Sequence, residues 1–333
     1  MSLTMTDPRR VAVSGETPTG GASPAPGALA SMTDHAAALR ARLSAEAVLL
    51  TGEPLARRTT LRVGGPADGY LEPAHEGDLA AALAFCRERN WPWFLLGRGS
   101  NLLVRDGGFR GLVISLGRPG FGAINREGDR LRCGAGARLK AVAVEARRLG
   151  LAGFEFLEGI PGSVGGALRM NAGAMGSAMF ALVETVRFMD ASGAVAERSA
   201  ADIPVTYRRC PFLTEHIALA AVLRGEPAEP DAIRARMEAY SRRRWETQPP
   251  QPSAGCIFKN PAAIPAGRLI QELGLKGERV GGACVSAVHG NFIVNDGGAT
   301  AVDMLTLIER IRERARRERG IELEVEVEII GEP

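Results

Sequence analysis

The spacing of apolar residues changes along the chain between a helical and a strand period, which predicts a protein of mixed α and β elements. Helices are predicted over 33–49, 78–89 and 139–149, and a charged helix ends near Trp245. Short apolar runs between turn residues predict strands at 93–96, near Leu131, at 183–189 and at 217–223. Residues 1–32 are rich in Pro, Gly, Ser, Thr and Ala with few large apolar side chains, so we expect a disordered leader there.

A change in composition after residue 225 marks the expected boundary between two domains. The stretch GEPAEP is followed by a charged helix, a Pro-rich loop and further α and β elements. We therefore divide the chain beyond its leader into a larger domain over 33–225 and a smaller α/β domain over 226–333, with the last strand free to return to the larger domain. A chain of 333 residues is long enough for two such domains.

The segment IELEVEVEII, residues 321–330, alternates strictly between apolar residues and glutamates. As a strand it presents four carboxylates on one face, from Glu322, Glu324, Glu326 and Glu328. Four like charges on one face are usually solvated, but one of them buried in a cleft would be a candidate acid or electrostatic stabiliser. Alternation alone leaves both interpretations open.

The charge balance is that of an ordinary globular protein, and the cysteine content fits a reducing cytoplasm. Basic and acidic residues nearly balance, 41 against 38, so no bulk field favours nucleic acid or a membrane surface. The densest basic run, 309–320, interleaves Glu with Arg, and an apolar helical stripe predicts that these arginines coat a solvated helix face: Val302, Leu305, Ile308 and Ile311. Five dispersed cysteines without a CxxC pair favour neither disulfides nor structural zinc. No apolar run reaches the length of a membrane span.

Glycine is over-represented, at 41 of 333 residues, and it concentrates in two loops of the larger domain. The first reads LGRGSNL and the second GIPGSVGGALRMNAG; the first is not a dinucleotide fingerprint, because GRGSNL lacks the third glycine of GxGxxG. Such loops expose backbone N–H groups and small donors that suit phosphate, so two of them favour a large diphosphate cofactor held from two sides. The candidate cofactor contacts are Gly97, Arg98, Gly99, Ser100, Asn101, Leu102, Pro161, Gly162, Ser163, Gly165, Gly166, Asn171 and Gly173.

These loops belong to an ordered series of motifs that resembles one enzyme family. The series runs from about Thr59 to Gly331 and reads TTLRVGGPADGYLEP, LGRGSNLLVRDGGFRG, GFEFLEGIPGSVGGALRMNAGAMG, YRRC, SAGCIFKNP, LIQELGLKG, VHGNFIVN and LEVEVEIIG. It is similar to the UDP-N-acetylenolpyruvoylglucosamine reductases, also called UDP-N-acetylmuramate dehydrogenases, in the branch without an inserted tyrosine-bearing loop. The resemblance implies an α+β fold: a two-part FAD-binding domain of the vanillyl-alcohol-oxidase type over 33–225 and a smaller α/β substrate-binding domain over 226–333.

The same resemblance implies an activity. Such an enzyme binds FAD and uses NADPH to reduce the enolpyruvyl ether of UDP-N-acetylglucosamine-enolpyruvate to the lactyl ether of UDP-N-acetylmuramate. This is a cytoplasmic step of peptidoglycan precursor synthesis. We expect no nucleic acid, no membrane and no obligate protein partner.

Matched residue by residue, the resemblance assigns roles in this reaction. The candidate catalytic residues are Arg208, Cys256 and Glu326, with Cys256 standing where most relatives carry a serine proton donor. The candidate substrate contacts are Tyr207, Lys259 and Asn260. The chain departs from the common family pattern at Cys256, Met175, Val325 and Glu328, and only the first of these positions touches the expected chemistry.

The residue types suit that chemistry. Hydride addition to the enolpyruvyl group builds negative charge toward the substrate carboxylate, and the guanidinium of Arg208 suits such a planar anion. A neutral thiol at Cys256 could then supply a proton, unless the ammonium of Lys259 lies close enough to favour the thiolate. The resemblance implies that Glu326 helps to hold the enol form.

Three other functions stay open on the sequence. The first is an FAD enzyme of the same fold that oxidises an alcohol with oxygen. The second is a flavin-free enzyme in which Cys256 is a nucleophile and His289 its base. The third is a UDP-sugar binder without turnover. We interpret His289 as a structural residue. The other cysteines are expected to be small buried hydrophobes: Cys86, Cys133, Cys210 and Cys284.

Overall fold

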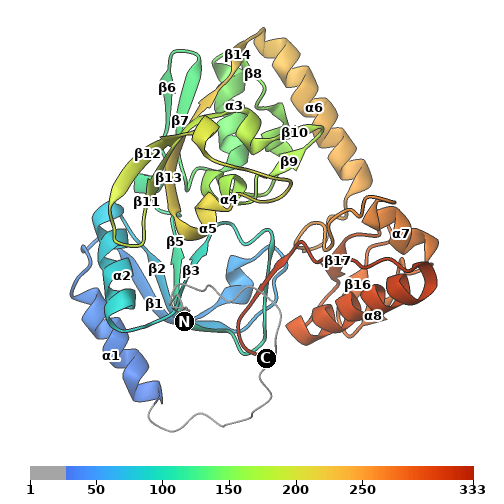
Figure 1. Cartoon of the computed structure of the whole chain (residues 1–333), viewed down its shortest axis with the longest axis horizontal. Helices are drawn as coiled ribbons and strands as arrows, with labels where there is room; N and C mark the ends of the chain where they lie inside the picture. The colour runs from blue at the N-terminus through green and yellow to red at the C-terminus, as the bar shows by residue number, and fades with distance from the viewer. Residues whose placement is uncertain (1–27) are drawn as a thin grey trace, which may run out of the picture.

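A computed structural model describes residues 28–333, and its N-terminal layer is a four-stranded sheet (Figure 1). In sheet order the strands are β1 (Val48–Pro54), β2 (Pro66–Glu72), β5 (Phe109–Ser115) and β3 (Trp93–Leu96). β1 is antiparallel to β2, whereas β5 runs parallel to both of its neighbours. The buried face of α2 (Glu76–Glu88) packs into the largest core of the molecule. The chain that leaves β3 carries the first glycine loop.

A second, fully antiparallel sheet continues the same core. In sheet order its strands are β12 (Val195–Ser199), β11 (Val183–Met189), β13 (Ile217–Arg224), β7 (Arg130–Gly134) and β6 (Ile124–Glu127). β13 is buried over almost its whole length, as expected for an apolar strand with both faces covered. The helices α3 (Leu139–Arg148) and α4 (Val164–Arg169) bury their apolar sides in this core, and the second glycine loop leads into α4.

The C-terminal residues form a separate core and then return to the first sheet region. Their elements are α7 (Ala266–Glu272), α8 (Ala301–Arg319) and a small antiparallel sheet of β15 (Arg279–Val280), β16 (Ala283–Val285) and β17 (Ile293–Asn295). The last strand, β18 (Glu328–Ile330), pairs in parallel with β4 (Leu102–Val104). The end of the chain therefore lies beside the first glycine loop.

The remaining α-helices and β-strands are short or peripheral. They are α1 (Ala28–Arg40), α5 (Phe212–Glu215), α6 (Pro230–Thr247), β8 (Leu151–Ala152), β9 (Gly173–Ala174), β10 (Ser177–Ala178) and β14 (Glu226–Pro227). None of the helices within residues 28–333 combines the length and apolarity needed to cross a membrane.

The helix predicted over 33–49 is wrong at both ends. α1 begins at Ala28, so the end of the expected leader is helical, and the rest of that leader lies outside the described residues. α1 ends at Arg40, and residues 48–54 form β1 because their backbone pairs with β2. Ser44 marks the break, since its backbone N–H and hydroxyl both donate to Asp78. Tertiary pairing here overrides local helical propensity.

The division expected at residue 225 assigns the charged helix α6 to the smaller domain, but α6 packs on the larger one. Its buried residues Ile233 and Met237 belong to the core of the preceding sheets and not to the C-terminal core. The polypeptide therefore crosses from one core to the other after α6, along the Pro-rich stretch 248–252.

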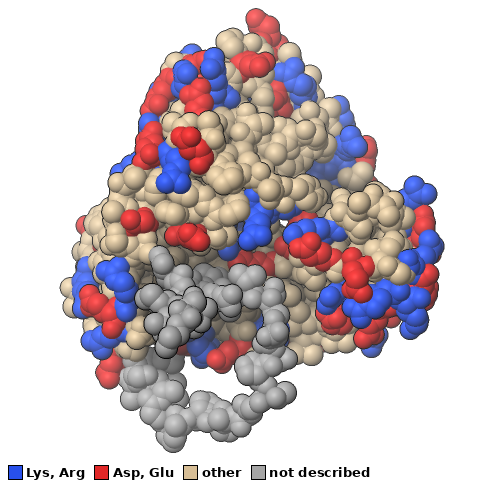
Figure 2. All heavy atoms as spheres, in the orientation of Figure 1, with Lys and Arg blue, Asp and Glu red and all other residues tan. Residues whose placement is uncertain are grey.

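The Arg-rich helix α8 has its predicted solvated face. Its arginines pair with neighbouring glutamates, and Figure 2 shows acidic and basic side chains intermingled over this part of the surface. The predicted apolar stripe is shifted by part of a turn: Ile308 and Ile311 are buried, but Val302 is 58% exposed.

Asp78 is the buried polar group on which the junction of α1, β1 and α2 depends, and we expect its removal to destabilise the fold. Its carboxylate accepts hydrogen bonds from Ser44 N, Ser44 Oγ and Ala74 N at 2.7–2.9 Å, and the residue is 2% exposed. Burial raises the pKa of Asp78, but these hydrogen bonds outweigh it and hold the pKa below its usual value. Asp78→Ala should lower the free energy of unfolding by about 1–3 kcal/mol at neutral pH.

The pH dependence has a definite sign. Because the folded-state pKa is depressed, the contribution of the carboxylate is complete above the unfolded pKa of ~3.9 and is lost as the pH falls below it. Urea unfolding of the wild type and Asp78→Ala at two pH values measures the difference, with the exposed Asp202→Ala as control. Equal losses for Asp78→Ala and Asp202→Ala would contradict this role.

Candidate active site

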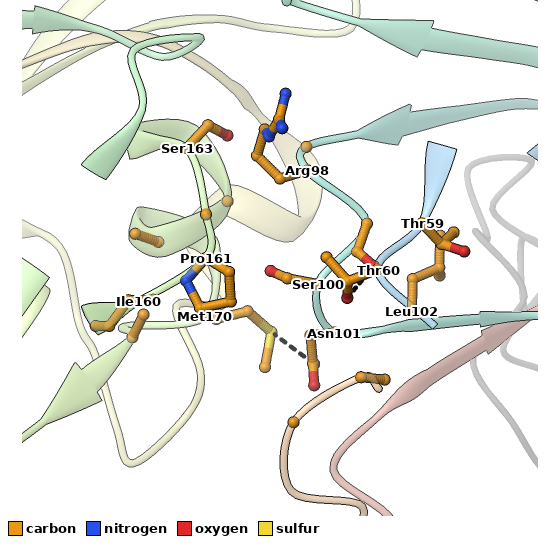
Figure 3. Close-up of a pocket in the computed structure, with 18 of the residues that line it drawn as sticks. Thr59, Thr60, Arg98, Ser100, Asn101, Leu102, Ile160, Pro161, Ser163 and Met170 are labelled. Atoms are coloured by element: carbon orange, nitrogen blue, oxygen red, sulfur yellow. Dashed lines mark hydrogen bonds between the residues drawn. The ribbon is translucent and has the colours of Figure 1, made fainter. Parts of the chain in front are cut away.

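One cavity of about 970 Å³ lies where the three parts of the fold meet. Both glycine loops line it, together with the segment 248–256 that leads to Cys256 and the glutamates of the C-terminal segment. Figure 3 shows the two loops on opposite sides of this space, with Ser100 and Asn101 facing Pro161 and Met170. The cavity therefore joins elements that are far apart in the sequence.

The first glycine loop is held in place by its own backbone. Gly99 adopts φ +61°, and a Cβ there would overlap the carbonyl oxygen of Arg58, so only glycine fits. Thr60 N donates to Gly99 O at 3.1 Å, and Asn101 Nδ2 donates to Glu326 O at 3.1 Å. The loop is thus tied on one side to the segment before β2 and on the other to the C-terminal segment.

The second glycine loop approaches the first closely. Gly165 N donates to Ala135 O at 2.8 Å, which fixes the loop to the end of β7. A Cβ on Gly97 would lie 3.3 Å from Ser163 Oγ and 3.8 Å from the Cα of Gly166. Side chains larger than hydrogen at Gly97 would therefore narrow the passage between the loops.

Positive charge dominates the ionised groups around the cavity. Its lining contains seven arginines and two glutamates: Arg57, Arg62, Arg98, Arg138, Arg169, Arg208 and Arg244, with Glu326 and Glu328. The two glutamates pair with two of the arginines, so an excess of positive charge is left for an anionic ligand. A diphosphate cofactor such as FAD fits this cavity in charge, in volume and in its two glycine walls.

All predicted cofactor contacts line the cavity except Asn171. That residue has a positive φ of 40°, its Oδ1 accepts from Phe180 N at 3.2 Å, and its Nδ2 donates to Thr206 O at 3.3 Å. Asn171 therefore shapes the turn after α4, and its direct contact with the cofactor stays a prediction.

The three predicted substrate contacts lie outside the cavity lining. Tyr207 is 60% exposed, with the guanidinium of Arg208 over its ring at 5.4 Å. Lys259 forms an ion pair with Glu324. Asn260 Oδ1 accepts from Ala266 N at 3.0 Å and so holds the start of α7. Contact of any of them with substrate stays a prediction.

The sequence analysis gave no role to several lining residues, because they lie outside the two glycine loops. They are Thr59, Thr60, Ser115, Arg138, Arg244 and Trp245. The available signals were the paired threonines that open TTLRVGG and the aromatic residue before the Pro-rich stretch. Arg138 comes just before α3, and Arg244 is the last of three consecutive arginines in α6, so nothing in their local sequence separates them from surface arginines.

Arg208, Cys256 and Glu326, the predicted catalytic residues, all line this cavity. Arg208 Nε lies 3.0 Å from Glu326 Oε1, but its N–H does not point at the carboxylate, so the contact is an ion pair and not an aligned hydrogen bond. Arg208 Nη1 donates to Gly173 O at 3.0 Å. The residue also has φ +58°, a conformation that costs a non-glycine residue about 1–3 kcal/mol.

The thiol of Cys256 is protonated at neutral pH. Burial raises its pKa to about 11, the charge of Glu326 adds to this shift, and Arg208 and a hydrogen bond from Asn291 oppose it. Lys259, whose ammonium engages Glu324, is not among the groups that stabilise the thiolate. The other four cysteines are buried, as expected, whereas Cys256 is half-buried in the cavity wall.

The four glutamates of residues 321–330 reach four different cations, and burial separates their roles. The pairs are Glu322 with Arg316, Glu324 with Lys259, Glu326 with Arg208, and Glu328 with Arg169. The side chains of Glu322 and Glu324 are 61% and 70% exposed, whereas that of Glu326 is 10% exposed. Burial raises the pKa of Glu326, and Arg208 and Lys259 oppose the rise. The carboxylates of Glu322 and Glu324 are thus solvated, whereas Glu326 belongs to the site.

His289 is placed as a structural residue. Its Nδ1 accepts from Asn291 N at 3.2 Å, its ring packs against Phe292, and burial lowers its pKa, with the positive charge of Lys276 acting in the same direction. His289 does not line the cavity, and a neutral imidazole with an occupied Nδ1 does not make a thiolate–imidazolium pair with a thiol of raised pKa. This arrangement argues against the cysteine-nucleophile interpretation.

Comparison with protein families divides the chain into an FAD-binding part and a C-terminal part. A model described as an FAD-binding domain matches residues 67–199, which contain both glycine loops. A model described as the C-terminal domain of UDP-N-acetylenolpyruvoylglucosamine reductase matches residues 248–330, which contain Cys256 and Glu326. The protein is an FAD-dependent oxidoreductase, and the predicted α+β fold with an FAD-binding domain of the vanillyl-alcohol-oxidase type is confirmed.

Individual relatives extend the match over almost the whole chain. The UDP-N-acetylenolpyruvoylglucosamine reductase of Geobacter metallireducens is 46% identical over 300 residues, which cover 89% of this chain and 98% of the relative. That of Bacillus velezensis is 41% identical over 286 residues, covering 85% and 94%. The crystal structure of the Thermus caldophilus reductase, 38% identical, covers 86% of this chain and 99% of its own with a TM-score of 0.73. This chain belongs to the UDP-N-acetylenolpyruvoylglucosamine reductase family.

A carboxylate placed between the glycine loops should empty the FAD site. Gly97→Asp would put a negative charge beside Ser163 and Gly166, where we expect the diphosphate, and like charges repel strongly in a narrow cavity. The visible absorbance of the purified protein should show little or no bound flavin. Gly122→Asp, the same change at a glycine outside the cavity with space for a Cβ, should retain its flavin. Full flavin occupancy in a folded Gly97→Asp protein would place the cofactor elsewhere.

Proposed function

We propose that this enzyme reduces the enolpyruvyl ether of UDP-N-acetylglucosamine-enolpyruvate to UDP-N-acetylmuramate, with NADPH as hydride donor. The observation that carries the proposal is one cavity that combines two glycine loops with a paired arginine, a protonated thiol and a buried carboxylate. The family supports the substrate class, since the relatives are named for its reduction. The test is a pair of half-reactions: anaerobic bleaching of the flavin by NADPH, then recovery of its colour on addition of the enolpyruvyl substrate.

In this proposal FAD, when bound, supplies the two-electron chemistry that carries a hydride from NADPH to the terminal carbon of the enolpyruvyl group. Arg208 binds the substrate carboxylate. Glu326 and Gly173 orient its guanidinium through Nε and Nη1, and Nη2 donates no hydrogen bond within the described residues. That end is available for a planar carboxylate, whose negative charge grows as the hydride arrives.

Cys256 donates the proton that completes the reduction. The carbon–carbon double bond gains a hydride at its terminal carbon and the thiol proton at the carbon that bears the ether oxygen, so it becomes a single bond. NADPH is oxidised to NADP⁺, and the thiolate left on Cys256 takes a proton from solvent. A thiol with a raised pKa is a neutral donor at rest, as this step requires.

Glu326 assists by holding Arg208 and by facing the carboxylate end of the substrate. Its raised pKa makes protonation of the carboxylate less costly, and a protonated carboxyl group can donate a hydrogen bond to the enol-like intermediate. Tyr207, Lys259 and Asn260 remain candidate substrate contacts at the edge of this site. We further propose that the reaction is a cytoplasmic step of peptidoglycan precursor synthesis and that it needs no protein partner, nucleic acid or membrane.

Substitution of Cys256 should affect only the second half-reaction. Cys256→Ala removes the donor, so substrate-driven reoxidation should slow by about 10²–10⁴-fold while reduction by NADPH is spared. Cys256→Ser should retain substantial activity. In the wild type the reoxidation rate should fall as the pH rises through about 11, where the thiol ionises, and the serine variant should lack this alkaline limb. Stopped-flow pH jumps measure both, and near-normal reoxidation by Cys256→Ala would assign the proton to another group.

Glu326 and Glu322 offer a matched comparison on one segment. Glu326→Gln removes the charge that orients Arg208, so reoxidation by substrate should slow by about 10²-fold with reduction by NADPH little changed. Glu322→Gln removes only an exposed pair with Arg316 and should stay within about twofold of the wild type. The measurement is single-turnover kinetics of both half-reactions. Equal effects of the two substitutions would deny Glu326 a specific role.

A further inference from the structure

Trp245 is an exposed aromatic residue in the wall of the cavity. It lies in the last turn of α6, lines the cavity and is 71% exposed, the largest fraction among the large apolar residues of 28–333. The other two tryptophans, Trp91 and Trp93, are buried and half-buried. An indole gains free energy when its apolar faces are covered, so its place in a concave wall points to a ligand that covers it.

Arg244, the preceding residue, lies on the side of α6 that faces the core. Ile233, Met237 and Tyr240 pack against the core at helical spacing. Arg244 comes four residues after Tyr240 and so continues the same face of the helix. A Cβ on Gly159 would lie 3.5 Å from Arg244 Cδ. The aliphatic part of the side chain is therefore packed, and this packing positions its guanidinium in the cavity wall.

The guanidinium of Arg244 lacks an anionic partner. Within residues 28–333 it forms no hydrogen bond and no ion pair, although the residue is half-buried. Burial lowers the pKa of Arg244, and the charge of Glu158 opposes this shift, but Glu158 itself pairs with Lys140 at 3.0 Å. A guanidinium keeps its charge in proteins, and a buried charge without a partner is unfavourable. Arg244 therefore favours a bound anion.

Trp245 and Arg244 begin the part of the wall that continues to the proposed proton donor. The Pro-rich segment 248–252 and then Cys256 follow them in the same cavity lining. Both residues belong to α6, outside the two glycine loops that we assign to FAD. Neighbouring residues of a helix project about 100° apart, so the indole and the guanidinium diverge toward two different parts of one ligand.

We propose that Trp245 and Arg244 form a subsite for a nucleoside diphosphate, in which the indole stacks on the base and the guanidinium binds the diphosphate. This inference rests on the proposed function, in which both reactants, the UDP-sugar and NADPH, carry a base and a diphosphate. A planar base covers the indole, and a diphosphate oxygen supplies the anion that Arg244 lacks. These parts of the reactants are remote from the reacting carbons, so the subsite sets affinity and leaves the chemical step to Arg208, Cys256 and Glu326.

The test measures the affinity of the oxidised holoenzyme for three probes by calorimetry, which needs no turnover. UDP and NADP⁺ carry different bases, and inorganic pyrophosphate carries none. Trp245→Ala should weaken the binding of UDP, of NADP⁺ or of both by about 5–100-fold and leave that of pyrophosphate within about twofold. Trp245→Phe keeps an aromatic face and should recover most of the loss. The nucleotide that loses affinity identifies the occupant of the subsite, and its KM should rise in Trp245→Ala with kcat unchanged.

Arg244→Ala tests the diphosphate half of the subsite. It should weaken the binding of pyrophosphate and of the same nucleotide by about 10–100-fold, because both lose a charge-assisted contact. Arg244→Gln keeps the packed stem and covers the case in which Arg244→Ala does not fold; it should weaken the same probes. Arg243→Ala is the matched control, since Arg243 is an exposed neighbour on α6 that does not line the cavity, and its affinities should stay within about twofold.

Three results would overturn the inference. The first is an unchanged affinity of Trp245→Ala for both nucleotides, or a wild type that binds neither. The second is an equal loss for pyrophosphate in Trp245→Ala, which would indicate general damage to the wall. The third is loss of bound FAD from Trp245→Ala in the visible spectrum, which would assign the indole to the cofactor. Failure of the enolpyruvyl substrate to reoxidise the reduced wild type would instead refute the proposed function, and the binding measurements distinguish the two failures.

Discussion

The site depends on one extended segment, residues 324–330, whose backbone pairs on both sides. Its first half bonds to the Cys256 loop, where Lys259 N donates to Glu324 O at 2.9 Å and Glu326 N to Ile257 O at 2.7 Å. Its second half joins the first glycine loop, with Glu328 N donating to Asn101 O at 3.1 Å before β18 pairs with β4. Successive side chains of an extended segment point to opposite faces. Backbone pairing on both sides therefore fixes which side chains of the segment face the cavity.

The same segment shows how burial decides the chemistry of identical side chains. Its four glutamates all find a cation, so pairing does not distinguish them. The exposed pairs of Glu322 and Glu324 are screened by water and stabilise little. Glu328 is held by two hydrogen bonds from Arg169, at 2.5 and 2.9 Å, and closes one wall. Only Glu326 combines a low exposure with a partner, Arg208, that keeps donors free for a ligand.

Local sequence predicted the elements and loops but not the packing that joins them. The glycine loops could be recognised because close backbone approach needs glycine, and Gly99 shows why. The alternation of residues 321–330 predicted which residues share a face, but the regular strand covers only Glu328–Ile330, since the rest pairs with a loop. The end of α1 and the attachment of α6 depend on contacts with distant residues, which no local period records.

One physical effect, removal of water, explains the state of all three catalytic candidates. In low dielectric, charge separation is costly, so burial raises the pKa values of Cys256 and Glu326 and favours their neutral forms. The same low dielectric strengthens the attraction of Arg208 for an incoming carboxylate. Arg208 cannot lose its charge, so it remains the cation to which an anionic substrate is drawn. The site thus holds a permanent cation for the substrate anion beside a thiol that still carries its proton, which suits reduction by hydride and proton and opposes nucleophilic attack by sulfur.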